Sequence, residues 1–106
     1  MVRLEIKSDA KDAESLIKSA IQTEIMRLEI GLKKTAKEMR QFEDKYNITS
    51  DTFLKEYAAE DLEGGDEEYV SWMGEIRIRR KIEEELDILK DIEYVDQRIS
   101  EWPHEN

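Results

Sequence analysis

The stretch from Ala10 to Tyr46 constrains the fold most, because it contains no proline and only one glycine, Gly31. Its apolar residues recur in alternating steps of four and three, the coiled-coil seam that a helix presents to one long helical neighbour. At about 1.5 Å per residue such a helix is roughly 55 Å long, so either a helical hairpin or an intermolecular bundle is expected. The predicted dimer seam is Ile21, Ile25, Leu28, Leu32, Met39 and Phe42, with Thr35 as a polar member.

The order of local signals predicts one mainly α domain over 1–106. We expect a strand over 1–7, a long helix over 10–46 with Ser8 or Asp9 as its N-cap, and a turn at Asn47. Thr49 is expected to cap a short helix over 50–59, followed by an acidic loop over 60–66. A third helix is expected over 67–95 and a flexible tail over 100–106. The two long helices then form an antiparallel hairpin in a dimeric bundle.

The N-terminal strand is predicted from the alternation of Val2, Leu4 and Ile6 with polar residues. A single strand has unpaired backbone groups on both edges, so we expect it to pair with a second copy. A ribbon-helix-helix DNA-binding module is the alternative. It is disfavoured because the following helix is too long and because Glu5 stands between the outward Arg3 and Lys7.

Charge separates the two halves of the chain. Residues 1–59 hold eleven Lys or Arg and eleven Asp or Glu, whereas residues 60–106 hold six and sixteen, so the whole net charge of −10 lies in the second half. An acidic surface repels nucleic acid and favours a basic partner. The chain has no cysteine, no apolar run long enough for a membrane span and no signal-peptide pattern, which predicts a cytoplasmic protein.

Six acids occupy the nine residues 60–68 around Gly64 and Gly65. They predict either a solvated loop, with Asp66 capping the third helix, or part of a docking surface for a basic partner. Metal capture is a weaker alternative, because the order of the acids does not follow an EF-hand loop. The basic cluster Arg77, Arg79, Arg80 and Lys81 neutralises these acids, binds a phosphate or contacts a partner. Trp72 beside Gly74 fits core packing, but Trp is also enriched at binding hot spots.

No catalytic motif and no cofactor or metal site is predicted. The best enzymatic alternative is a magnesium-dependent nucleotide pyrophosphohydrolase of the MazG type. Its two carboxylate pairs would be Glu60 with Glu63 and Glu84 with Asp87.

The segments Glu24–Lys33, Phe42–Phe53 and Trp72–Arg77, in this order after a strand, carry a family resemblance. The chain resembles small archaeal and cyanobacterial proteins that look like antitoxin partners of type II toxin-antitoxin pairs. This resemblance implies a non-enzymatic, homodimeric protein that neutralises a small basic toxin. A structural or adaptor dimer remains the second prediction. The predicted partner-binding residues are Glu60, Asp61, Glu63, Asp66, Glu67, Glu68, Trp72, Arg77, Glu84 and Asp87.

Overall fold

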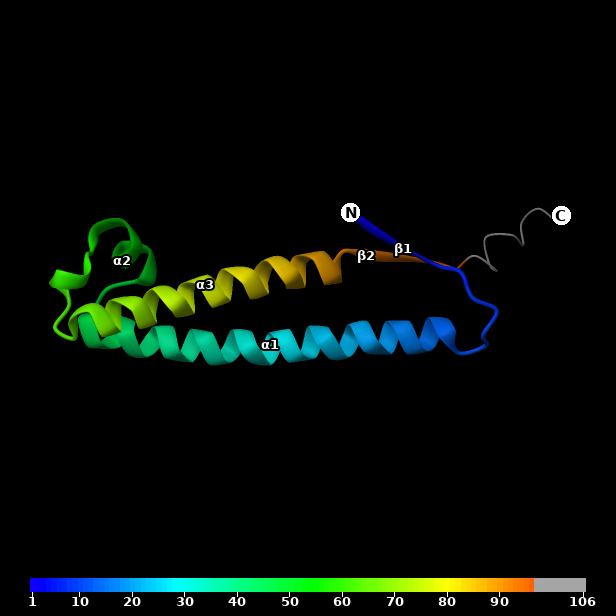
Figure 1. Ribbon diagram of the computed structural model, residues 1–106, viewed down its shortest axis with the longest axis horizontal. Helices are drawn as coiled ribbons and strands as arrows, with labels where there is room; N and C mark the ends of the chain where they lie inside the picture. The colour runs from blue at the N-terminus through cyan, green and yellow to red at the C-terminus, as the bar shows by residue number, and fades with distance from the viewer. Residues whose placement is uncertain (97–106) are drawn as a thin grey trace.

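The computed structural model describes residues 1–96, which form an elongated helical hairpin with a small sheet at one end (Figure 1). The molecule measures 71 × 22 × 18 Å along its principal axes. Strand β1 covers Val2–Ile6, helix α1 Ala13–Tyr46, helix α2 Ser50–Glu56, the 3₁₀ turn η1 Ala59–Asp61, helix α3 Gly65–Lys90 and strand β2 Ile92–Asp96. The mainly helical architecture and the long α1 are therefore confirmed. The predicted tail, 100–106, lies outside the described residues.

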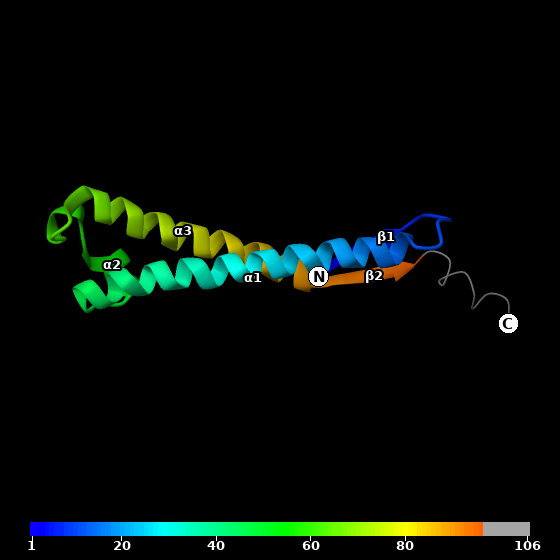
Figure 2. The same ribbon diagram turned by 90° about the horizontal axis from the view of Figure 1, so that it is seen from below.

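Helices α1 and α3 lie side by side along most of α3 (Figures 1 and 2). Near the middle of the hairpin, the hydroxyl of Thr35 lies 3.0 Å from the Glu75 carbonyl oxygen and 2.7 Å from the Glu75 carboxylate. Thr35 is 2% exposed, so these contacts explain how one polar residue is tolerated in an apolar seam. Further along, Gly31 allows a close approach, since a Cβ there would lie 3.2 Å from Ile82 Cδ1.

The residues of the predicted dimer seam pack against α3 of the same chain, whereas they were expected to join two copies. Toward the strands, Ile25 and Leu28 are buried with Leu86 of α3, and neighbouring apolar side chains pack around them. Toward the tip of the hairpin, Met39 is buried with Trp72 and Ile76. The helical neighbour of this seam is therefore α3 of the same chain. The remaining seam residues also belong to these two clusters: Ile21, Leu32 and Phe42.

The turn between α1 and α2 follows the prediction. Asn47 adopts a left-handed conformation with φ 54°, and its N–H donates to Glu43 of the preceding turn. Thr49 caps α2 by accepting a hydrogen bond from Thr52 N at 3.1 Å. Ile48 packs against the cluster that contains Phe53, as a hydrophobic staple requires. Helix α2 ends at Glu56, three residues earlier than predicted.

Two predicted N-caps are wrong by a few residues. The N-cap of α1 is Asp12, whose side chain makes no capping hydrogen bond, rather than Ser8 or Asp9. Helix α3 begins at Gly65 with Gly64 as its N-cap, so Asp66 lies in the first turn of the helix instead of capping it. In that position the carboxylates of Asp66 and Glu67 still interact favourably with the positive end of the helix dipole.

The end of the third helix is the main correction to the predicted fold. Helix α3 stops at Lys90, and Ile92–Asp96 forms β2 instead of continuing the helix to 95. Strand β2 pairs in parallel with β1, with Val2 opposite Ile92 and Leu4 opposite Tyr94. The partner of the N-terminal strand is therefore in the same chain. Both strands run beside the first third of α1, where Ile6 is buried and Lys18 lies over the Tyr94 ring (Figure 1).

Candidate protein-binding surfaces

The tip of the hairpin is held by an aromatic cluster. Trp72 of α3 has no exposed surface, and its ring stacks on Phe53 with centroids 4.0 Å apart. Phe42 and Tyr46 of α1 stack on the same indole at 5.4 and 5.9 Å. Aromatic pairs in this range stabilise a core beyond the area that they bury. The short α2 is thereby fixed onto both long helices, and the tip has a defined shape.

Trp72, which was predicted as a partner contact, is consequently a core residue with no exposed surface. Its indole Nε1 donates to Ser50 Oγ at 2.9 Å, and Ser50 Oγ donates to Glu43 Oε2 at 2.8 Å. Glu43 also accepts a hydrogen bond from Ser50 N at 2.9 Å. The polar end of the indole is satisfied within the chain, so nothing in its surroundings requires a partner.

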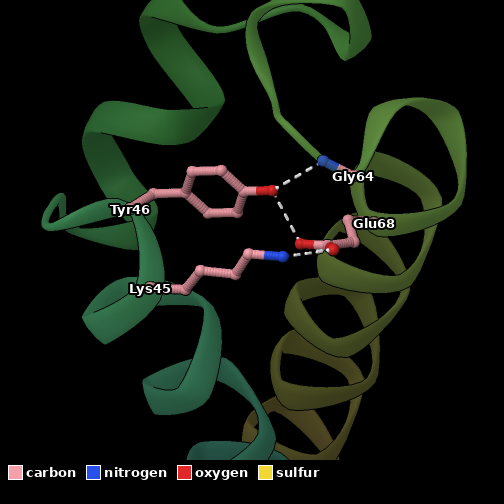
Figure 3. Close-up of polar contacts among 4 residues, drawn as sticks. All are labelled: Lys45, Tyr46, Gly64 and Glu68. Atoms are coloured by element: carbon pink, nitrogen blue, oxygen red, sulfur yellow. Dashed lines mark hydrogen bonds and ion pairs between the residues drawn. The ribbon is translucent and has the colours of Figure 1, made fainter.

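A second polar network closes the tip around Glu68 (Figure 3). Lys45 Nζ donates to Glu68 Oε2 at 2.6 Å and Tyr46 Oη donates to Glu68 Oε1 at 2.7 Å. Tyr46 Oη in turn accepts from Gly64 N at 3.0 Å. The hydrogen bonds from Lys45 and Tyr46 lower the pKa of Glu68, and the bond to Glu68 raises the pKa of Lys45. Any Cβ on Gly64 would collide with the Glu68 carboxylate, so this network requires glycine there.

Most acids of the tip are not used by these networks. Residues 41–68 contain ten Asp or Glu and only two Lys or Arg, a local net charge of −8. Glu43 and Glu68 are half-buried and hydrogen-bonded, and Asp61 accepts a hydrogen bond from Ala58 N at 2.7 Å. The other seven are exposed and have no hydrogen bond or ion pair to any described residue: Asp44, Asp51, Glu56, Glu60, Glu63, Asp66 and Glu67.

The structure brings part of the predicted partner-binding set together and separates the rest. Glu60, Asp61, Glu63, Asp66, Glu67 and Glu68 all lie at the tip. Arg77 is exposed in the middle of α3, and Glu84 and Asp87 are exposed nearer its end. From Gly65 to Glu84 the helix rises roughly 28 Å. Within one chain, the carboxylate pairs proposed for the pyrophosphohydrolase alternative are thus too far apart to share a magnesium ion.

The basic cluster of α3 is barely paired. Arg79 Nε lies 3.8 Å from Glu83 Oε1 on the same helix, too far for a hydrogen bond. Among the described residues, Arg77, Arg80 and Lys81 have no ion-pair partner. Direct pairing with the acids of the tip is therefore not the arrangement that the structure shows.

Several large apolar side chains are exposed on the outer faces of the helices. On α1 these include Met26 and Ile30, which are four residues apart and therefore share one face of the helix. On α3, Val70 and Ile78 are exposed as well. Each lies two residues from a buried residue of the same helix. Their exposure can be deduced from the sequence only when the face of α3 that packs against α1 is known.

The chain matches no protein-family model, and neither curated proteins nor solved structures show a significant similarity to it. No helix within residues 1–96 carries an apolar stretch that could cross a lipid bilayer.

Proposed function

We propose that this protein is a non-enzymatic binding protein that neutralises a small basic protein, in the manner of an antitoxin. The observation that carries the proposal is the tip of the hairpin, where seven exposed carboxylates make no hydrogen bond or ion pair with a described residue, at the end of the molecule that also holds the packed aromatic cluster. A surface of fixed shape and strongly negative net charge attracts a basic partner over long range and accelerates association. The resemblance of the segments Glu24–Lys33, Phe42–Phe53 and Trp72–Arg77 to antitoxin-like proteins implies the same function.

The rigidity of the tip matters for this proposal. A disordered acidic segment loses conformational entropy when it binds, whereas residues held by Trp72, Ser50 and Glu68 are already ordered. The acids of α3 at Glu84 and Asp87 form a second, separate acidic region. We expect the tip to supply the main contact because more unpaired carboxylates converge there.

The test is co-purification of the tagged chain from its own host at low and high salt. The expected result is one small basic protein that is released as salt rises, because screening weakens charge attraction. The tip variant Glu60→Lys with Glu63→Lys should lose this protein. Glu5→Lys with Asp9→Lys changes the same number of charges outside the tip and should retain it. The variant Glu84→Lys with Asp87→Lys decides whether α3 contributes.

Neutralisation is tested separately by expressing the captured protein in a heterologous host. Growth should stop when it is expressed alone and should resume when this chain is expressed with it. If growth is never affected, or if the tip variant protects as well as the natural chain, the proposal is wrong.

A structural adaptor is the second candidate, and it is favoured by the exposed pair Met26 and Ile30 on the outer face of α1. Two apolar residues four positions apart offer a site to one helix of another protein. Replacement of both by serine would then abolish the captured complex, while the charge variants of the tip would leave it intact.

A further inference from the structure

Five residues of α3 are spaced symmetrically about Gly74. Glu67, Val70, Gly74, Ile78 and Lys81 follow one another in steps of three, four, four and three. These steps place the five residues on one face of a helix. Gly74 is two residues from both Trp72 and Ile76, which are buried, so the stripe faces away from the core. In the middle of α3, α1 is the only described element alongside (Figures 1 and 2).

The stripe combines two exposed apolar side chains with two exposed charged ones. Val70 is 67% exposed and Ile78 is 48% exposed. Glu67 and Lys81 are exposed, and neither has an ion pair with any described residue. A shallow depression lies beside Val70, lined by Asp66, Glu67, Glu68, Val70 and Ser71.

Gly74 has no role in packing within the described part of the chain. A Cβ at Gly74 would meet no atom within 4 Å, whereas one at Gly31 would press on Ile82. Glycine in the middle of a helix is less favourable than alanine, so a glycine on an open face lacks an explanation in the monomer. A close approach of another helix from outside gives it one.

We propose that a second copy of this chain docks on this stripe, antiparallel, with the two-fold axis passing near Gly74. Glu67 of each copy then lies beside Lys81 of the other, and Val70 lies beside Ile78. The depression next to Val70 receives the Ile78 side chain of the second copy. This inference does not rest on the proposed neutralising function.

The symmetry of the stripe selects this arrangement. A two-fold contact uses the same patch on both copies, so each residue must complement the one related to it by the axis. An acid at one end and a base at the other meet this condition only when the helices are antiparallel. A parallel arrangement would place Glu67 against Glu67 and Lys81 against Lys81, which is repulsive. The glycine at the centre lets the two backbones approach there.

Sedimentation of the full chain over a range of concentrations tests the proposal. The natural chain should form a dimer, and Gly74→Leu should weaken the dimer by roughly tenfold or more because the helices can no longer approach. Leucine is a good helix former and the position is open, so circular dichroism should show the Gly74→Leu monomer fully folded. The control is Ile30→Ser on α1, because Ile30 is 68% exposed and Val70 of the stripe is 67% exposed. This variant should leave the dimer unchanged.

Charge exchange identifies the register. Glu67→Lys and Lys81→Glu should each weaken the dimer, since each creates two like-charged pairs across the two-fold axis. An equal mixture of the two variants should restore dimers, because the copy with bases at both positions then faces a copy with acids at both. A natural chain that stays monomeric at all concentrations overturns the proposal. A dimer whose dissociation constant is unchanged by Gly74→Leu and by the charge variants also overturns the proposal.

Discussion

The indole Nε1 of Trp72 lies 2.9 Å from Ser50 Oγ, and this buried hydrogen bond joins α3 to the first residue of α2. Ser50 Oγ in turn donates a hydrogen bond to Glu43 Oε2 of α1 at 2.8 Å. One short polar chain therefore ties together the three helices that the aromatic cluster packs. Its strength should be visible in the stability of the whole tip, because Trp72 and Ser50 are both buried.

Replacing Ser50 by alanine should destabilise the protein by about 1–3 kcal/mol, because it leaves the buried Trp72 Nε1–H without an acceptor. Urea unfolding followed by circular dichroism measures the free energy of unfolding. The double-mutant cycle with Trp72→Phe provides the control, since phenylalanine removes the donor. If Ser50→Ala costs the same in the Trp72→Phe background, the hydrogen bond is not the cause of the loss.

The connection between α1 and α2 was predictable because its determinants are local. Asn47 accepts a left-handed conformation and Thr49 caps the helix that it precedes, and neither needs information from distant residues. Strand β2 was not predictable in the same way. Leu86, Leu89 and Ile92 continue the helical spacing, and no proline or glycine marks the end of α3. The strand exists because β1, at the other end of the sequence, pairs with it.

The sequence also predicted only part of the candidate site. The acidic character of residues 60–68 follows from composition alone, and the structure gathers these acids at the tip. Whether Trp72 is exposed depends on Phe53 and Phe42, which reach it from two other helices. Sequence spacing cannot decide which of two helix faces a distant aromatic residue will cover. For the same reason the α1 seam was assigned to a second copy when α3 covers it.

The two glycines inside long helices should respond differently to alanine. Gly74→Ala should raise the free energy of unfolding of the monomer by up to about 1 kcal/mol, because alanine is the better helix former and no atom opposes its Cβ. Gly31→Ala should gain less, because Ile82 Cδ1 must move by a few tenths of an ångström. Thermal unfolding at low protein concentration compares them. Equal gains would mean that α1 and α3 are not in close contact at Gly31.

The pH dependence of stability should report Glu68. Its pKa is lowered in the folded protein by the hydrogen bonds from Lys45 and Tyr46, relative to about 4.3 in an unfolded chain. The carboxylate therefore contributes stability above that unfolded value, and the contribution is lost as pH falls from about 5 through the folded pKa. We expect the melting temperature of the natural chain to fall more steeply over this range than that of Glu68→Gln.

The control for this experiment is Glu60→Gln, which removes an exposed carboxylate of the same tip without a hydrogen bond or ion pair to a described residue. Its melting curve should keep the steep acid dependence of the natural chain. Parallel curves for the natural chain and Glu68→Gln would show that the network in Figure 3 does not lower the pKa of Glu68.

The pairing of β1 with β2 can be tested by cross-linking, because the chain has no cysteine and Arg3 lies opposite Glu93 in the register. Arg3→Cys with Glu93→Cys should form a cross-link within one chain on mild oxidation or with a short thiol-reactive linker. The product should run as a monomer of altered mobility on a denaturing gel. Arg3→Cys alone should give little cross-linked product, since its strand partner then carries no thiol. Covalent dimers from Arg3→Cys alone would instead show that β1 pairs with β1 of a second copy.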